Sequence, residues 1–201
     1  MTPKATFLSE RRIEAVVLGA SAGGIEALLA LLDGLAPPWR LPVVIVLHLP
    51  EGHESHLAEI FAERLQVPVH EAADKMPVGA GAVYFAPPGY HLSIERNRCF
   101  SLSCEPPVRF SRPSIDVLMA SAADAYGSAL AGVLLTGAND DGAEGLHRIY
   151  LAGGLTAVQA PHDAQVPTMP EAAIALHRPD HVLSLRELRA LLLQLESAHA
   201  H

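Results

Sequence analysis

The sequence has few cysteines, few basic residues and no long apolar run, and each shortage excludes a class of protein. Its 201 residues include 2 cysteines, too few for the disulfide framework of a small secreted protein. The 14 Lys and Arg residues stand against 22 Asp and Glu, a formal net charge of -8, whereas nucleic-acid-binding proteins usually present a basic face. No apolar run approaches the ~20 residues of a membrane-spanning helix, so we expect neither nucleic-acid binding nor membrane insertion.

The N-terminal segment has no apolar core of the signal-peptide type. We interpret residues 1–12 as a loose lead-in, residues 13–201 as a single domain, and the cytoplasm as the location of the protein. Half of the residues are hydrophobic and 18% are charged, which is typical of a compact folded chain. Cys99 and Cys104 fall in an alternating stretch, and we expect them to be reduced and structural.

Short apolar runs alternate with helical patterns through most of the chain, which predicts a doubly wound α/β domain with a mainly parallel sheet. An antiparallel hairpin is expected where residues 91–95 and 99–103 alternate around Arg96-Asn97-Arg98. Ser184 and Glu187 have the spacing of a capping box at the start of a terminal helix. The predicted strands are 13–18, 41–47, 67–69, 82–86, 129–136, 155–159 and 182–183, and the predicted helices are 24–35, 55–65, 114–126, 142–151, 171–176 and the segment from 184.

The first strand ends in Gly19-Ala20-Ser21-Ala22-Gly23, which fits the G-x-S-x-G pattern of a nucleophile elbow. In such an elbow a sharp strand-to-helix turn exposes a serine hydroxyl beside the N–H groups of the following helix. A phosphate-binding turn or a plain chain reversal is the alternative. The dinucleotide fingerprint G-x-G-x-x-G fails because Ser21 takes the place of its second glycine, and no Gly-Lys-Ser/Thr follows.

Polar residues also follow two other predicted strands, His48 after 41–47 and Asn139-Asp140-Asp141 after 129–136. In a doubly wound sheet, ligands bind outside the carboxyl ends of the strands. Ser21, His48 and Asp141 supply a nucleophile, a base with a pKa near neutrality and a carboxylate that orients the base.

Each of these residues has an alternative role. His48 could close a strand end, and Asp141 could be a turn or cap residue before Gly142. Asp140 competes with Asp141 for the carboxylate role. His48, His53 and His56 could be zinc ligands, but their spacing is irregular and no carboxylate or cysteine completes the set. We therefore expect no metal and no cofactor.

Five blocks of the sequence together resemble the catalytic domain of the chemotaxis-type, CheB-like protein-glutamate methylesterases. They are Gly19 to Gly24, the strand that ends in His48-Leu49-Pro50, Arg112 to Leu118, Leu135 to Ala143, and Met169-Pro170 with Ala172 to Ile174.

The resemblance implies Ser21 as nucleophile, His48 as general base and acid, and Asp141 as the orienting carboxylate. It implies hydrolysis of glutamate γ-methyl esters on chemoreceptor helices with release of methanol, and deamidation of receptor glutamines as a second reaction. The backbone amides of Ala22 and Ala138 are candidates for the oxyanion hole. Pro87, Tyr90 and Met169 are candidates for contact with the substrate, because they lie on loops near strand ends.

Three features depart from the family pattern. Ala22 replaces the usual threonine after the serine, and Ala138-Asn139 replace Met-Gly in the usual Thr-Gly-Met-Gly. The residues before Ile13 are too few for the receiver domain that usually precedes such a catalytic domain. We therefore expect a methylated chemoreceptor as substrate and a separate receiver or signalling protein as a further partner. The other hypotheses are a catalytically weak regulator that binds receptors or signalling partners, and a serine esterase or amidase for small molecules.

Overall fold

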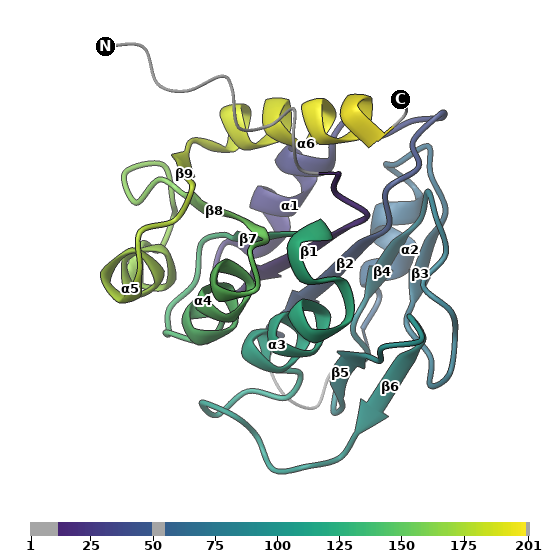
Figure 1. Cartoon of the computed structure of the whole chain (residues 1–201), viewed down its shortest axis with the longest axis horizontal. Coiled ribbons are helices and arrows are strands. Elements are labelled where there is room, and N and C mark those ends of the chain that lie inside the picture. The colour runs from purple at the N-terminus through teal and green to yellow at the C-terminus, as the bar shows by residue number, and fades with distance from the viewer. Residues whose placement is uncertain (1–11, 50–54, 200–201) are drawn as a thin grey trace.

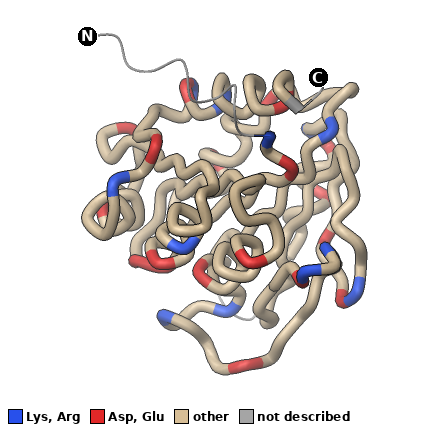
Figure 2. The backbone as a smooth tube through the Cα atoms, viewed as in Figure 1, with Lys and Arg blue, Asp and Glu red and all other residues tan. Residues whose placement is uncertain are grey.

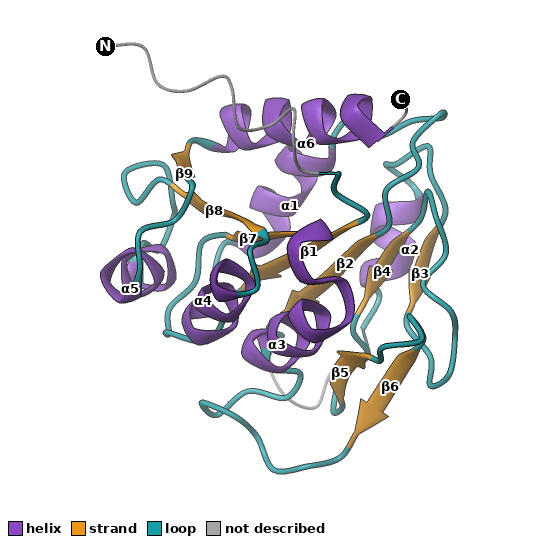
Figure 3. Cartoon of the chain, in the orientation of Figure 1, coloured by secondary structure: helices purple, strands orange, loops and turns teal. Residues whose placement is uncertain are grey.

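A seven-stranded sheet runs through the middle of the molecule, with helices on both faces (Figures 1 and 3). The computed structural model describes residues 12–49 and 55–199. The strand order is β3-β4-β2-β1-β7-β8-β9, and all six neighbouring pairs are parallel. The strands are β1 Ala15–Ala20, β2 Val43–Leu47, β3 Val69–Glu71, β4 Val83–Phe85, β7 Leu130–Leu134, β8 Leu155–Gln159 and β9 His181–Leu183.

The doubly wound, mainly parallel fold predicted from the sequence is confirmed. The separate antiparallel hairpin is also confirmed, as β5 His91–Ile94 paired with β6 Phe100–Ser103. The expected lead-in over residues 1–12 lies outside the described residues except for Arg12.

Two hydrophobic layers sandwich the sheet because its central strands are buried on both faces. In β1, Val16, Leu18 and Ala20 point to one layer, whereas Ala15 and Val17 point to the other. This alternation is the two-residue period of a strand. The first layer is covered by α1 Gly24–Leu32, α2 Leu57–Ala62 and α6 Leu185–His199, and the second by α3 Ile115–Tyr126, α4 Ala143–Leu151, α5 Thr168–Leu176 and the hairpin.

The boundaries of α1, α2 and α5 differ from the predicted ones. α1 ends at Leu32 and α2 covers only Leu57–Ala62, so both are shorter than predicted. α5 starts at Thr168, three residues earlier than predicted, with Pro170 inside its first turn. Proline is tolerated there because the first N–H groups of a helix have no intrahelical acceptor. The capping box of α6 is confirmed: Ser184 N donates to Glu187 Oε2 at 2.9 Å, and Glu187 N donates to Ser184 Oγ at 3.4 Å.

The chain changes direction across the sheet at β1. It builds β2, β3 and β4 on one side of β1, and then crosses to β7, β8 and β9 on the other side. Ligand sites of open α/β sheets lie at the carboxyl ends of the strands at such a switch point. Acidic and basic residues are interspersed over the elements (Figure 2), and among the described helices none is long and apolar enough to span a bilayer.

Candidate active site

Ser21 and His48 lie at the carboxyl ends of adjacent strands. The register pairs Ala20 with Leu47 as the last partners of β1 and β2, and Ser21 and His48 are the next residue of each strand. The His48 amide continues the pairing by donating to the Ala20 carbonyl at 3.1 Å. Both residues therefore stand at the switch point of the sheet.

The turn after Ser21 has the conformation of a strand-to-helix elbow. Gly24 N donates to the Ser21 carbonyl at 2.8 Å, and Gly23, the residue before α1, has φ 76°. A Cβ at Gly23 would lie 2.3 Å from Gln165 Oε1. This position therefore requires glycine for its backbone angle and for the close approach of Gln165.

Thr136 holds the elbow from the neighbouring strand end. Its carbonyl accepts from Ser21 N at 3.0 Å, and its buried hydroxyl donates to the Ala22 carbonyl at 2.9 Å. The same hydroxyl oxygen accepts from Val166 N at 2.9 Å. One threonine thus joins the turn at Ser21 to the loop that precedes α5.

His48 is hydrogen-bonded to Asp141, its partner from the loop after β7. Nε2 of His48 lies 2.8 Å from Oδ2 of Asp141, which is fully buried. Although burial alone raises the pKa of the Asp141 carboxyl, hydrogen bonds from His48, from the α3 amides and from Ser114 lower it below its usual value. Asp141 is therefore ionised at neutral pH, and an ionised carboxylate only accepts hydrogen bonds. The proton of neutral His48 consequently sits on Nε2, and Nδ1 has no hydrogen-bond partner within residues 12–49 and 55–199.

The start of α3 supplies the other donors to Asp141. Ile115 N donates to Oδ2 at 2.7 Å, Asp116 N to Oδ1 at 3.1 Å, and Ser114 Oγ to Oδ1 at 2.8 Å. A carboxylate at a helix N-terminus is stabilised both by these unpaired N–H groups and by the helix dipole. A Cβ at Gly19 would lie 2.4 Å from Ile115 Cγ2, so this glycine lets α3 approach the end of β1.

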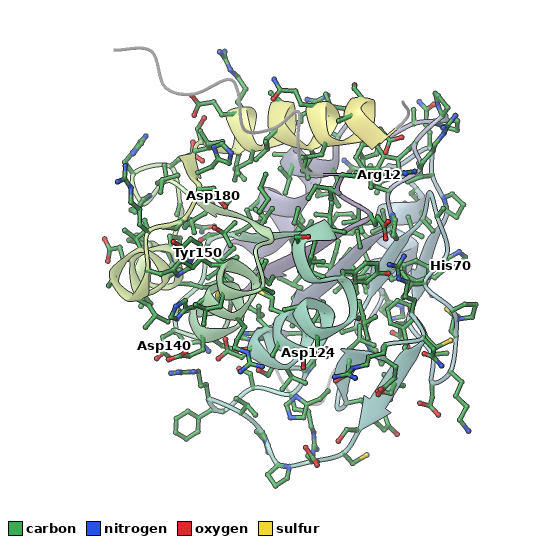
Figure 4. All side chains as sticks on the ribbon, viewed as in Figure 1. Arg12, His70, Asp124, Asp140, Tyr150 and Asp180 are labelled. Atoms are coloured by element: carbon green, nitrogen blue, oxygen red, sulfur yellow. The ribbon has the colours of Figure 1, made fainter. Side chains whose placement is uncertain are left out.

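Asp140 takes a different position from Asp141. Its side chain is exposed at the outer edge of the molecule beside α4 (Figure 4) and forms an ion pair with Arg109. Asn139 Oδ1 accepts from Asp141 N at 3.2 Å, so the residue that replaces glycine in this loop helps to shape it. The structure thus brings His48 together with Asp141 and not with Asp140.

The two amides predicted for the oxyanion hole share one property among the described residues. Within residues 12–49 and 55–199, neither Ala22 N nor Ala138 N has a hydrogen-bond acceptor, and both residues are exposed. The neighbouring Gly137 is fixed, because its N–H donates to Val166 and its carbonyl accepts from Met169, each at 3.0 Å. Ala138 is therefore presented from an ordered loop.

The three predicted substrate contacts have different surroundings. Tyr90 is 42% exposed. Pro87 is buried. Met169 is also fully buried, and a Cβ at Gly137 would lie 2.4 Å from its Cε and 3.0 Å from Ser21 Cβ. Met169 packs under the loop of Ala138, and the contacts of these three residues with a substrate stay a prediction.

The two described histidines that were candidates for zinc ligands, His48 and His56, each contact a different carboxylate. His48 contacts Asp141, the exposed His56 lies 2.6 Å from Glu59, and His53 is outside the described residues. Among the residues described, no group of three or more His, Cys, Asp or Glu is arranged to hold a metal ion.

A cavity of about 60 Å³ beside His48 is lined mainly by residues that the sequence did not single out for this role. They are Leu49, Phe110, Ser111, Arg112 and Pro113. His91 supports this region: it is 2% exposed, and its ring lies 3.1 Å from the Pro106 carbonyl and accepts from Ser114 N at 3.2 Å. Ser114 was recognised in the sequence only as part of a block, because its contact with Asp141 spans 27 residues.

Comparison with known proteins agrees with this geometry. The family model described as CheB methylesterase matches residues 16–192. This chain belongs to the CheB methylesterase family. The crystal structure of the Thermotoga maritima CheB methylesterase catalytic domain superposes with a TM-score of 0.83 and 30% sequence identity, covering 89% of this chain and 98% of that one.

The family's curated members include both short and long proteins. A Leptospira interrogans protein, named for methylesterase and glutaminase activities, is 43% identical over 91% of this chain and 95% of its own length. Protein-glutamate methylesterase/protein-glutamine glutaminase 2 of Anaeromyxobacter dehalogenans is 42% identical over 92% of this chain, which spans 54% of that protein. The CheB methylesterase fold described above accordingly forms nearly all of one relative and about half of the other.

Proposed function

We propose that this CheB family member hydrolyses γ-methyl esters of glutamate side chains on chemoreceptor proteins, releasing methanol, with Ser21, His48 and Asp141 as its catalytic triad. The observation that carries the proposal is the 2.8 Å contact between His48 Nε2 and a fully buried Asp141. The names of the Anaeromyxobacter and Leptospira relatives support the choice of substrate and add glutamine deamidation as a second reaction.

In the first half of the reaction, Ser21 Oγ attacks the ester carbonyl while His48 takes its proton. Asp141 holds the Nε2 proton of His48, so Nδ1 is the nitrogen that accepts the serine proton. The imidazolium that forms is stabilised by the buried carboxylate. His48 then returns the proton to the leaving methoxide, and methanol departs from the acyl-enzyme.

In the second half, water takes the place of the serine hydroxyl. His48 removes a proton from the water as it attacks the acyl carbonyl, and Ser21 leaves with that proton. The Ala22 and Ala138 amides donate to the oxyanion in both tetrahedral intermediates, an interaction for which each donor is typically worth ~3 kcal/mol. Deamidation follows the same steps with ammonia as the leaving group.

The cavity beside His48 is compatible with a substrate that enters it with a single side chain. Pockets that bury a drug-sized ligand usually span ~300–1,000 Å³, whereas this cavity measures about 60 Å³. The end of a glutamyl ester side chain on a protein would suit a space of this size.

The decisive experiment measures methanol release from methylated receptor membranes with the wild type and with Ser21→Ala. We expect steady release from the wild type and a loss of most turnover in the variant, with an unchanged circular dichroism spectrum. Near-normal release by Ser21→Ala would contradict the nucleophile assignment. A folded wild type without release on several receptor sources would instead favour the regulator hypothesis.

A further inference from the structure

The loop between β6 and α3 ends in a tight turn whose backbone is unusual for its residues. Val108 and Ser111 exchange two backbone hydrogen bonds of 3.1 and 2.8 Å. The two residues between them, Arg109 and Phe110, have φ 47° and 63°. Such a turn is normally built from Asn-Gly or Gly-Gly, because a side chain at positive φ is strained. Here a bulky aromatic residue occupies a position that suits glycine.

The turn is fixed to the elements that carry the site. The Arg109 guanidinium donates to Asp116 Oδ2 at 3.1 Å and also forms an ion pair with Asp140. Asp116 belongs to the first turn of α3, and Asp140 directly precedes Asp141. The tip of the loop is therefore held in a set position relative to the Asp141–His48 pair.

Within the described residues, no packing of the Phe110 side chain offsets the strain of its backbone. Its side chain is 100% exposed, so it buries no apolar area and stabilises no packing. Yet it lines the same small cavity as His48. A strained residue that persists at a site is a reason to look for a role in function, and an exposed aromatic ring is the residue type that anchors protein–protein contacts.

We propose that Phe110 is a substrate-recognition residue that packs against an apolar side chain of a helical protein substrate, about one turn from the ester-bearing glutamate. This inference rests on the proposed function. On a helix, residues three and four positions apart are neighbours, with Cβ atoms ~5–6 Å apart. A glutamyl ester that enters the cavity beside His48 would thus place an apolar neighbour of the same helix over the Phe110 ring.

The charge beside Phe110 fits the same occupant. Arg112 lines the cavity, and its guanidinium donates to the carbonyls of Cys104 and Glu105 at 3.1 and 3.2 Å. Within the described part of the chain it has no carboxylate partner. An aromatic ring next to a cation complements an amphipathic helix whose apolar stripe is bordered by glutamates.

The test compares a receptor substrate with a small ester for the wild type, Phe110→Ala and Tyr150→Ala. Tyr150 is a matched control because it is 47% exposed near the other end of α4, away from Asp140 (Figure 4). Methanol release is measured over a range of concentrations of methylated receptor membranes. Hydrolysis of p-nitrophenyl acetate is measured on the same preparations, and a thermal melt verifies folding.

We expect the ratio of the two kcat/KM values, receptor over p-nitrophenyl acetate, to fall about tenfold or more in Phe110→Ala, mainly through KM of the receptor. Tyr150→Ala should keep the wild-type ratio. A ratio within twofold of wild type in Phe110→Ala would overturn the inference while methanol release by the wild type still upheld the function. A wild-type dimer that Phe110→Ala converts to a monomer would also overturn it, because the ring would then serve self-association.

Discussion

Asp116 and Asp141 each accept hydrogen bonds from the backbone amides that begin the other's helix. Asp141 receives the amides of Ile115 and Asp116 at the start of α3. Asp116 in turn receives Gly142 N at 2.9 Å and Gly145 N at 2.7 Å at the start of α4. These reciprocal hydrogen bonds join the N-termini of α3 and α4. Asp141, whose carboxylate contacts His48, is one of the two side chains that make them.

Removing the Asp116 side chain should loosen this arrangement. Asp116→Ala leaves two amides of α4 without acceptors, and we expect a loss of about 2 kcal/mol in the free energy of unfolding. Asp116→Asn should be much milder. It keeps an oxygen acceptor and removes a carboxyl whose pKa is raised, chiefly by burial and also by the charge of Asp141. Urea unfolding of both variants measures the difference, and equal losses would argue against the capping role.

The two adjacent aspartates should differ sharply in their effect on turnover. Asp141→Asn puts an amide NH₂ among groups that donate to the carboxylate and disturbs the tautomer of His48, so kcat should fall ~10⁴-fold. Asp140→Asn weakens an exposed ion pair with Arg109, which Asp116 still holds, and its kcat should stay within about threefold of wild type. Steady-state methanol release separates the two. A larger effect of Asp140→Asn would move the carboxylate role to that residue.

The order of strands and helices follows from the sequence because buried parallel strands read as continuous apolar runs. The same pattern predicts that Ser21 and His48 follow the carboxyl ends of two strands, and the register shows that these strands are neighbours. The pattern does not distinguish Asp140 from Asp141. What distinguishes them is that Asp141 is buried under the start of α3, and the α3 residues that contact it lie 25 or more positions away in the sequence. Phe110 was missed for a related reason. Its turn contains neither glycine nor asparagine, the residues by which such a turn is normally predicted. The ion pairs of Arg109 with Asp116 and Asp140 hold the turn instead, and both carboxylates are distant in the sequence.

Relieving the strain at the tip of the loop should separate stability from substrate recognition. Glycine adopts positive φ without the steric penalty of a side chain, which costs ~1–2 kcal/mol for an L-residue. We therefore expect Phe110→Gly to raise the free energy of unfolding by about 1 kcal/mol, because the lost ring buries nothing. Its receptor KM should nevertheless rise as in Phe110→Ala. Chemical denaturation and receptor kinetics on one preparation test both expectations, and a destabilised variant would show that the relief of strain is smaller than the entropy that glycine adds to the unfolded chain.

His177 should make the stability of the protein depend on pH. Burial, and then the neighbouring His147, lower the pKa of His177; its ring stacks on that of His147, and both ring nitrogens are buried without a partner among the described residues. The unfolded chain therefore takes up a proton at higher pH than the folded chain. Stability is full above the unfolded pKa of ~6.5 and declines as the pH falls through it.

Replacing this imidazole should flatten the pH dependence. Between pH 8 and pH 5, the melting temperature of His177→Gln should fall less than that of the wild type, because glutamine has no proton to take up. Thermal melts at several pH values provide the measurement. Parallel curves for the two proteins would contradict the assignment.

The hydrogen bond between His48 and Asp141 joins residues that are 93 positions apart, on opposite sides of β1. During folding, the first half of the chain can pair β1 with β2 and bring the strand ends at Ser21 and His48 together, but it lacks Asp141, the carboxylate that contacts His48. The pairing of His48 with Asp141, on which the proposed reactivity of Ser21 depends, is therefore a property of the completed sheet. A covalent label for activated serines can be applied at intervals after dilution from denaturant. The time at which labelling begins would report when the second half of the chain docks, a step that spectroscopic signals of helix formation do not distinguish.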